Sequence, residues 1–148
     1  MFRIERIKPN KIDLFEDMNA LFAEEFDDQE SYTNHRPSKK YINKLLRNEY
    51  FIPLIARQEN EIVGALAAYE LVKFEQERSE IYIYDLAVKR QYRRKGIAAS
   101  LINELRKIAK QRGAYVIFVQ ADTGEEDKPA IALYTKLGGT SKNSSILI

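Results

Sequence analysis

Tyr84-Asp85-Leu86-Ala87-Val88 and, shortly after it, Arg93-Arg94-Lys95-Gly96-Ile97-Ala98 are the stretches of sequence that decide the fold. The first ends a strand predicted over residues 79–88, which alternates in polarity and is rich in β-branched and aromatic residues. The second is a basic turn with a glycine, and it opens into a helix that Gly113 ends. Such a turn points backbone N–H groups and a positive helix end at one place, which suits a phosphate-bearing ligand.

The remaining pattern predicts one mixed α/β domain over residues 1–148, without repeats or linkers. We expect antiparallel pairing among the early strands and a βαβ crossover late in the chain, with residues 29–37 and 122–128 as loops. The run at 115–120 is nearly all apolar, which is typical of a strand buried on both faces. The other expected strands are 2–7, 50–57, 62–71 and 146–148, and the other expected helices are 11–26, 38–46 and 129–137.

The composition removes several classes of protein. The chain has no cysteine, which excludes disulfides, thiolate metal sites and a cysteine nucleophile. Its one histidine, His35, argues against a multi-histidine metal site, and no metal is expected. The start of the chain lacks the apolar run of a signal peptide, and no apolar segment approaches membrane-spanning length. We therefore expect a cytoplasmic protein that does not bind membranes.

Charge is unevenly distributed although the net charge is only +2. An acidic cluster lies within residues 24–30, a basic cluster within 89–95 and a second acidic group within 122–127. Any one of these runs could be ordinary solvated surface. Together they predict a protein with two ligands, an anionic cofactor at the basic turn and a cationic substrate near the carboxylates.

Arg93-x-x-Gly96-x-Ala98 resembles the pyrophosphate-binding turn of the GCN5-related N-acetyltransferases (GNAT), which hold acetyl-coenzyme A. Longer stretches, among them 64–69, 78–88 and 132–138, are similar to the type I aminoglycoside 3-N-acetyltransferases. The resemblance implies the GNAT fold, a central mixed β-sheet flanked by helices. It also implies acetyl transfer from acetyl-coenzyme A to the 3-amino group of a gentamicin-type antibiotic, by direct attack in a ternary complex. Dimers are usual in the family, which makes a homodimer a possible assembly, although the sequence itself carries no independent signal for one.

The sequence departs from the family pattern in two places, the loop 124–129 and the tail after Gly139. In the part that matches, Gly96 lets the backbone approach a pyrophosphate closely, and the neighbouring basic side chains add positive charge. Leu86 and Val88 lie where the family's strand offers backbone groups to the pantetheine arm. The predicted cofactor-binding residues are Leu86, Ala87, Val88, Arg93, Arg94, Lys95, Gly96, Ile97, Ala98 and Ala99.

Three side chains are candidates for catalysis. Tyr134 matches the family tyrosine near the cofactor sulfur, and a phenol of pKa about 10 can hydrogen-bond or protonate a departing thiolate. Asp85 is a carboxylate in an apolar run; it could cap a strand bulge, or it could orient the acceptor ammonium and accept its proton. His35 lies in a segment that resembles a histidine-bearing family segment, which implies acceptor binding or a proton relay, although a lone loop histidine is also ordinary surface.

The predicted substrate-binding residues are mostly acidic, since they must face a cation. Glu80 is left out because an odd separation of five residues along one strand should place it on the opposite face from Asp85. The predicted residues are Glu24, Asp27, Asp28, Tyr84, Asp85 and Asp122.

Other functions stay open at this point. The same chemistry would serve a polyamine, a diamine or a protein amino terminus as acceptor, because the carboxylates suit any of these cations. A non-catalytic acetyl-coenzyme A-binding module is another class. A nucleic-acid-binding module is disfavoured, because the net charge is near neutral and no basic stripe is interleaved with aromatic residues.

Overall fold

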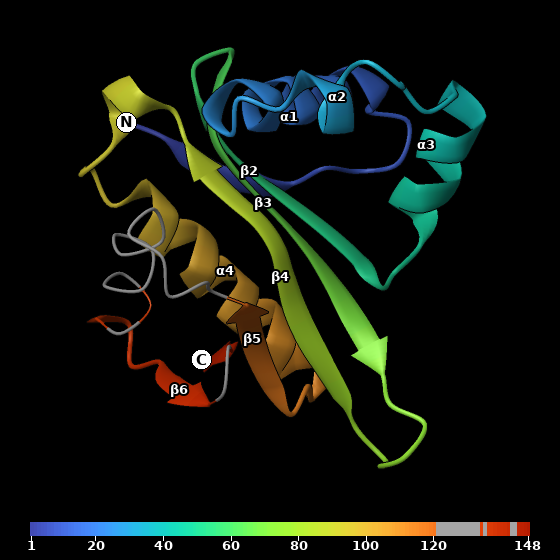
Figure 1. The fold of residues 1–148 in the computed structure, drawn as a ribbon, viewed down its shortest axis with the longest axis vertical. Coiled ribbons are helices and arrows are strands. Elements are labelled where there is room, and N and C mark those ends of the chain that lie inside the picture. The colour runs from blue at the N-terminus through green and yellow to red at the C-terminus, as the bar shows by residue number, and fades with distance from the viewer. Residues whose placement is uncertain (121–133, 135, 143–144) are drawn as a thin grey trace.

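The computed structural model describes residues 1–120, Tyr134, residues 136–142 and residues 145–148 (Figure 1). Within these residues, no helix is both long and apolar enough to cross a membrane. The strands are β1 (Arg3–Arg6), β2 (Phe51–Gln58), β3 (Glu61–Val72), β4 (Ser79–Val88), β5 (Val116–Gln120), β6 (Thr140–Lys142) and β7 (Ser145–Leu147); the α-helices are α1 (Ile12–Glu25), α2 (Gln29–Tyr32), α3 (Lys39–Arg47) and α4 (Ile97–Arg112).

One mixed sheet joins all of these strands in the order β1-β2-β3-β4-β5-β7-β6. Strands β1 to β4 pair antiparallel, and β4 pairs parallel with β5 after the chain has crossed through α4. The predicted early antiparallel pairing and late βαβ crossover are therefore confirmed. Strand β7 returns antiparallel to β5 and carries β6 on its other edge.

Helices cover both faces of the sheet, and each face has its own hydrophobic core. Figure 1 shows α1, α2 and α3 on one side of the sheet and α4 on the other. Helix α4 buries Leu101, Ile102 and Leu105 against a core that includes Ile81 and Ile83 of β4. The opposite core is formed by α1, α3 and the sheet and includes Phe15, Met18, Phe22, Ile42, Ile55 and Ala87.

A β-bulge near the end of β4 changes which face its side chains occupy. Ala67 pairs with Asp85 but Ala68 pairs with Ile83, so Tyr84 is the extra residue on β4. Before the bulge Ile83 packs on the α4 side, and after it Ala87 packs on the α1 side. One added residue reverses the alternation of faces. The prediction that Glu80 and Asp85 lie on opposite faces is therefore wrong, because it assumed an unbroken period of two.

The same end of β4 separates from β5. Their pairing ends at Ile83 with Val119, so no strand among the described residues pairs with the later part of β4 on that side. The Lys89 N–H donates to the Val63 carbonyl in β3 at 2.9 Å. Because backbone groups alternate between the two edges of a strand, those of Leu86 and Val88 face away from β3, toward the gap.

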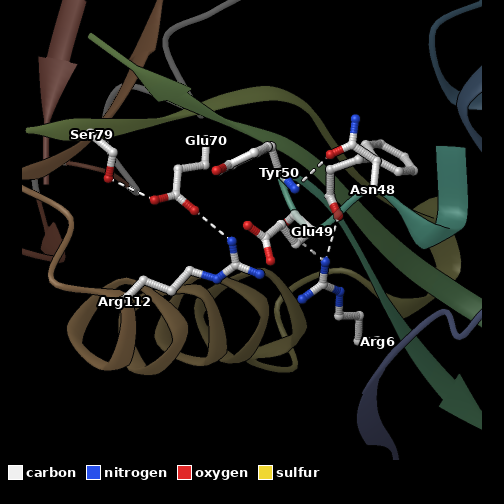
Figure 2. A network of polar contacts seen from close by, with 8 residues as sticks. Arg6, Asn48, Glu49, Tyr50, Glu70, Ser79 and Arg112 are labelled. Atoms are coloured by element: carbon white, nitrogen blue, oxygen red, sulfur yellow. Dashed lines mark hydrogen bonds and ion pairs between the residues drawn. The ribbon is translucent and has the colours of Figure 1, made fainter.

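Polar contacts tie the far end of α4 to the sheet (Figure 2). Arg112 donates to Glu70 of β3, and Glu70 also accepts a 2.7 Å hydrogen bond from the Ser79 hydroxyl of β4. Arg6 of β1 donates at 2.6 Å to the backbone carbonyl of Phe51 in β2. Burial and the nearby Arg112 charge lower the pKa of Arg6. The contact of Arg112 with Glu70 holds the C-terminal end of α4 on the sheet, opposite the end that begins at Ile97.

Several sequence-based boundaries need correction. The predicted loop 29–37 contains the single turn α2, which Asp28 caps by accepting from the Ser31 N–H at 3.0 Å. Strand β6 was not predicted, and β5 is not buried on both faces, because Val116 and Phe118 are only half-buried. The predicted loop 122–128 and most of the predicted helix 129–137 lie outside the described residues.

Candidate active site

A pocket of about 650 Å³ opens where β4 meets the start of α4. It lies at the gap between β4 and β5, and the end of α1 contributes Glu25 and Phe26 to its wall. The predicted cofactor residues of the strand, the turn and the helix therefore come together in one place, with the predicted catalytic tyrosine. Its lining includes Leu86, Val88, Arg94, Gly96, Ala98 and Tyr134.

Gly96 begins α4 in a left-handed conformation, with φ of +81°. A Cβ added there would meet no described atom within 4 Å other than those of its chain neighbours, so among the described residues nothing fills the space in front of the turn. The first helical hydrogen bond runs from the Ser100 N–H to the Gly96 carbonyl, at 3.0 Å. The N–H groups of Ile97, Ala98 and Ala99 therefore have no carbonyl within the helix to bind, and they are available to an anion.

Of the three predicted basic residues, Arg94 lines the pocket, while the side chains of Arg93 and Lys95 contact other groups. Arg93 forms a 2.9 Å ion pair with Glu25, whose side chain is only 9% exposed, and its Nε donates to the Val88 carbonyl at 3.2 Å. Lys95 places its ammonium 5.5 Å from the Tyr92 ring centroid and does not line the pocket. Arg93 therefore joins α1 to the turn, and Glu25, which the sequence reading did not single out as a site residue, holds it there.

Gly64 of β3 is a second residue whose role the sequence did not reveal. A Cβ at this position would lie 2.8 Å from Cγ2 of Ile97 and 3.4 Å from the Ala87 carbonyl. Ile97 is buried and belongs to the α4-side core. Gly64 therefore lets the first residue of α4 pack directly on the sheet, which brings the helix N-terminus to the end of β4.

Acetyl-coenzyme A fits this set of groups by its chemistry. Its pyrophosphate matches the three available N–H groups and the positive end of α4. Its amide-containing pantetheine arm matches the backbone groups of Leu86 and Val88 that face the gap. Most of the residues that line the pocket are small or apolar, and the charge of Glu25 is compensated by its ion pair with Arg93.

Asp85 lies beside this pocket and is held by a tyrosine from another element. Oη of Tyr32, in α2, donates to Oδ2 of Asp85 at 2.7 Å. Burial raises the pKa of Asp85, and the hydrogen bond from Tyr32 lowers it by less, so the net change is upward. Among the described residues, no arginine, lysine or histidine forms an ion pair with Asp85. A half-buried carboxylate without a cationic partner suits a cationic ligand.

Aromatic side chains surround this carboxylate on the sheet. Tyr84, the bulge residue, is 58% exposed, and its ring meets those of Tyr69 and Tyr82 edge to face, at 5.7 and 5.9 Å. Tyr82 stacks on Phe118 of β5 at 4.9 Å. Burial, the Tyr84 and Tyr41 phenols and the Asp85 carboxylate raise the pKa of Tyr69. Tyr84 thus contributes to an open aromatic surface next to Asp85.

Tyr134 is buried, with 4% of its surface exposed, and it belongs to the α4-side core while lining the pocket. Tyr134 lines the same pocket as Gly96, although the two residues are 38 positions apart in the sequence. This placement is compatible with both interpretations of the residue, an aromatic group that packs on the sheet and a phenol that faces the donor.

The other predicted site residues do not gather at Asp85. His35 is exposed and contacts Glu30 at 2.6 Å. Glu24 lines a separate hollow with Glu61 and Lys89. Asp27 has a positive φ of 50° at the end of α1, and Asp28 is the cap of α2, while Asp122 lies outside the described residues. Within the described ranges, no three histidine, cysteine, aspartate or glutamate side chains are grouped as metal ligands.

Two related enzymes are among the solved structures that match the chain. An aminoglycoside acetyltransferase from an uncultured soil metagenomic sample is 56% identical, with a TM-score of 0.91; the match covers 96% of this chain and 93% of that one. A second, from the same kind of sample and in complex with sisomicin, is 31% identical, with a TM-score of 0.84 over 95% of this chain and 90% of that one.

More distant structures share only the fold. A ribosomal-protein-alanine N-acetyltransferase from Brucella melitensis biovar Abortus 2308 is 22% identical, with a TM-score of 0.70 over 96% of this chain and 94% of that one. No curated protein sequence matches the chain. The model of the Acetyltransferase (GNAT) family matches residues 13–139, most of the chain. With the glycine turn, the open end of β4 and the helix N-terminus at one pocket, this match shows that the chain belongs to the Acetyltransferase (GNAT) family and is an N-acetyltransferase.

Proposed function

We propose that this acetyltransferase moves the acetyl group of acetyl-coenzyme A to an amine of an aminoglycoside, at the 3-amino group of a gentamicin-type substrate. The observation that carries the proposal is the 56% identity, over 96% of the chain, to an aminoglycoside acetyltransferase. The likeness to an enzyme in complex with sisomicin supports the same class of acceptor. The half-buried Asp85, without a cation among its described partners, supports a polycationic acceptor independently of either relative.

The donor is held by the pocket at the start of α4. The N–H groups of residues 94–99 bind the pyrophosphate, and Arg94 adds a positive charge at its edge. The backbone groups of Leu86 and Val88 bind the pantetheine arm, and Ala87 and the side chains around it complete the wall. Arg93 acts by keeping the turn attached to Glu25 and Val88, and Lys95 adds charge near the turn.

Asp85 and Tyr134 carry the proton steps of direct transfer in a ternary complex. Acetyl-coenzyme A supplies the acetyl group as a thioester, whose carbon–sulfur bond breaks as the bond to the acceptor nitrogen forms. Asp85 accepts the proton that the acceptor ammonium must lose before its nitrogen can attack. Tyr134 donates a hydrogen bond or a proton to the departing thiolate. The family resemblance supports these roles: Tyr134 lines the donor pocket, and Asp85 directly precedes Leu86, which also lines it.

The acidic residues near the end of α1 act before the chemical step, by attracting the cationic acceptor to the protein. Glu24, Asp27 and Asp28 lie at the end of α1 and the start of α2 and attract a polycation by long-range electrostatics, together with Asp122. Tyr84 contributes an exposed aromatic face beside Asp85. The role of His35 in a proton relay stays a prediction. Its exposed ring is paired with Glu30, and we therefore expect His35→Gln to change turnover less than Asp85→Asn.

Thiol release from acetyl-coenzyme A with gentamicin, spermidine and a short peptide as parallel acceptors tests the acceptor class. The proposal predicts a much higher kcat/KM with gentamicin than with the other two, and a product acetylated at the 3-amino group by NMR. Faster turnover of spermidine or of the peptide amino terminus would overturn the aminoglycoside assignment and leave the acetyltransferase in place.

Substitution of Asp85 tests the proposed base. Asp85→Asn keeps the shape of the side chain and removes its ability to accept a proton at neutral pH, so kcat with gentamicin should fall by about 100-fold or more. Binding of coenzyme A, measured by calorimetry, should not change, because Asp85 does not line the donor pocket. A variant with wild-type kcat would remove Asp85 from the proton transfer.

A further inference from the structure

We infer that Tyr32 is a positioning residue for acetyl transfer: its phenol fixes the Asp85 carboxylate and keeps it able to accept a proton from the acceptor amine. The inference rests on the proposed function, in which Asp85 is the base. Tyr32 and Asp85 are 53 residues apart in sequence, and one 2.7 Å hydrogen bond from Oη to Oδ2 joins them. Tyr32 belongs to α2, so this bond connects the helical layer on one face of the sheet to the bulged end of β4.

The Tyr32 side chain is held before any ligand binds. Its ring packs against Phe22 and Phe26 of the end of α1, with centroid distances of 5.8 and 5.9 Å. The turn that carries it is fixed by Asp28, which accepts from the Ser31 N–H at 3.0 Å. A donor held in this way loses little conformational entropy when it binds a carboxylate. The phenol can therefore fix one Asp85 oxygen in a single place.

The hydrogen bond leaves half of the carboxylate for the acceptor. Only Oδ2 accepts from Tyr32, and no other described side chain donates to Asp85. An ionised carboxylate has two oxygens and about four acceptor positions, so Oδ1 is available to an incoming ammonium. The bulge at Tyr84 brings Asp85 to the same face as α2, which is why the bond can form at all.

The charges around Asp85 make Tyr32 important for its ionisation. The groups whose charges act on this pair are the phenols of Tyr69 in β3 and Tyr84 in β4, and the Asp28 carboxylate at the start of α2. Arg36 and Glu16 share a small hollow with Tyr32, but they form an ion pair with each other at 4.0 Å, and Arg36 forms none with Asp85. Burial raises the pKa of Asp85, and the bond from Tyr32 is the opposing influence that lowers it. Removing the phenol oxygen should therefore raise the pKa of Asp85 further and leave less of it ionised near neutral pH.

Tyr32→Phe tests this role, because phenylalanine keeps the ring contacts and removes only the donor. The pH profile of kcat/KM with gentamicin should keep its shape, while its acidic limb moves about one pH unit higher, since a hydrogen bond to a charged group is worth roughly that much. KM for acetyl-coenzyme A should stay as in the wild type, because Tyr32 does not line the donor pocket. A change in packing alone would not move the acidic limb.

Tyr115→Phe is the matched control. Tyr115 is also a partly exposed tyrosine (65%), but its ring lies under the Arg78 guanidinium at 3.7 Å, and Tyr115 lines none of the described pockets. Its pH profile should match that of the wild type. In an Asp85→Asn background, Tyr32→Phe should not lower the residual kcat/KM any further, because the group that it acts on is absent.

The outcomes separate the two claims. An inactive Asp85→Asn variant together with an unmoved acidic limb in Tyr32→Phe would overturn the inference and leave the proposed function standing. A fully active Asp85→Asn variant would overturn the proposed base, and the inference with it. If Tyr32→Phe fails to fold, 3-fluorotyrosine at position 32 provides the second test: its more acidic phenol is a stronger donor and should move the acidic limb lower, and an unmoved limb would again overturn the inference.

Discussion

At the scale of single residues, Gly96 and Gly113 begin and end the same helix with the same backbone requirement. Their φ angles are +81° and +69°, and an added Cβ would meet no protein atom within 4 Å at either position. A left-handed conformation costs a residue with a Cβ about 1–2 kcal/mol. Only Gly96 lines the donor pocket, so the two glycines separate conformational strain from ligand binding.

Gly96→Ala should therefore weaken coenzyme A binding by about tenfold, since about 1.4 kcal/mol of strain or displacement in the turn corresponds to that factor. Isothermal titration calorimetry with coenzyme A measures the effect. Gly113→Ala is the control. It should lower the thermal stability about as much as Gly96→Ala does, because the backbone strain is the same, while its affinity for coenzyme A stays that of the wild type. Equal affinities for both variants and the wild type would mean that the turn does not hold the donor.

Asp85 should oppose the stability of the fold at neutral pH. Its folded-state pKa is raised, mainly by burial, above the ordinary value. A carboxyl shifted in this direction contributes stability below its unfolded pKa and loses that contribution as the pH rises through the folded pKa. Asp85→Asn should thus raise Tm at pH 7, and the gain should shrink as the pH falls toward about 4. Scanning calorimetry across this range checks the sign, and a lower Tm at pH 7 would contradict it.

At the scale of elements, the packing of α4 on the sheet depends on Gly64. A Cβ at Gly64 would come within 2.8 Å of Cγ2 of Ile97, a stiff β-branched side chain at the first position of α4. Gly64→Ala should reduce the free energy of unfolding by about 1–3 kcal/mol and weaken coenzyme A binding, because the helix start must move. Chemical denaturation and calorimetry measure the two effects.

A double-mutant cycle identifies the cause of the Gly64 effect. Ile97→Ala removes the methyl group in question, so Gly64→Ala should cost much less in that background than in the wild type. An equal cost in both backgrounds would show that another contact, such as the 3.4 Å approach to the Ala87 carbonyl, limits the position.

Elements that depend on local sequence periodicity could be predicted, whereas a feature that depends on strand pairing could not. Helix α4 and strand β4 follow from local periodicity, and both were located to within a residue. A bulge near Asp85 was one of two interpretations that the sequence left open. Its presence at Tyr84 could not be decided from the sequence, because it arises from the pairing of β4 with β3 and leaves no turn residue. The error on Glu80 followed from that bulge alone.

The site, too, could be predicted only where its residues form a local motif. The glycine turn has a local signature, whereas Tyr32, Glu25 and Gly64 act through contacts with residues far away in the chain. Tyr32 lies in a stretch predicted as loop, and nothing in its immediate neighbours indicates that its partner is Asp85. A carboxylate in an apolar strand does signal that some partner must exist, but the sequence alone does not identify the partner.

At the scale of the whole molecule, the two ends of α4 have separate tasks. The helix has 16 residues, so its ends are about 24 Å apart. Its N-terminal end forms the donor pocket, and its C-terminal end carries Arg112, which binds Glu70 in the network of Figure 2. The Glu70 side chain is 7% exposed and also accepts from Ser79.

Glu70→Gln should therefore reduce stability without affecting catalysis. Removing the charge weakens the bonds to Arg112 and Ser79, and we expect a loss of about 1–3 kcal/mol in the free energy of unfolding. Glu104→Gln is the control, because Glu104 pairs at 3.9 Å with the exposed Lys107 and should change stability by less than about 0.5 kcal/mol. Both variants should keep kcat/KM within about twofold, as expected for changes remote from the site. A large loss of kcat/KM in Glu70→Gln at full folding would show that the two ends of α4 are coupled.

The central claim is that one pocket and one carboxylate together transfer acetyl to an aminoglycoside amine. Its most direct test is a parallel measurement of thiol release and of acetylated gentamicin by mass spectrometry, with wild-type protein and Asp85→Asn. The account predicts one acetyl group gained per thiol released in the wild type, and loss of both signals in the variant while coenzyme A still binds. Thiol release without acetylated gentamicin, or equal product from both proteins, would contradict it.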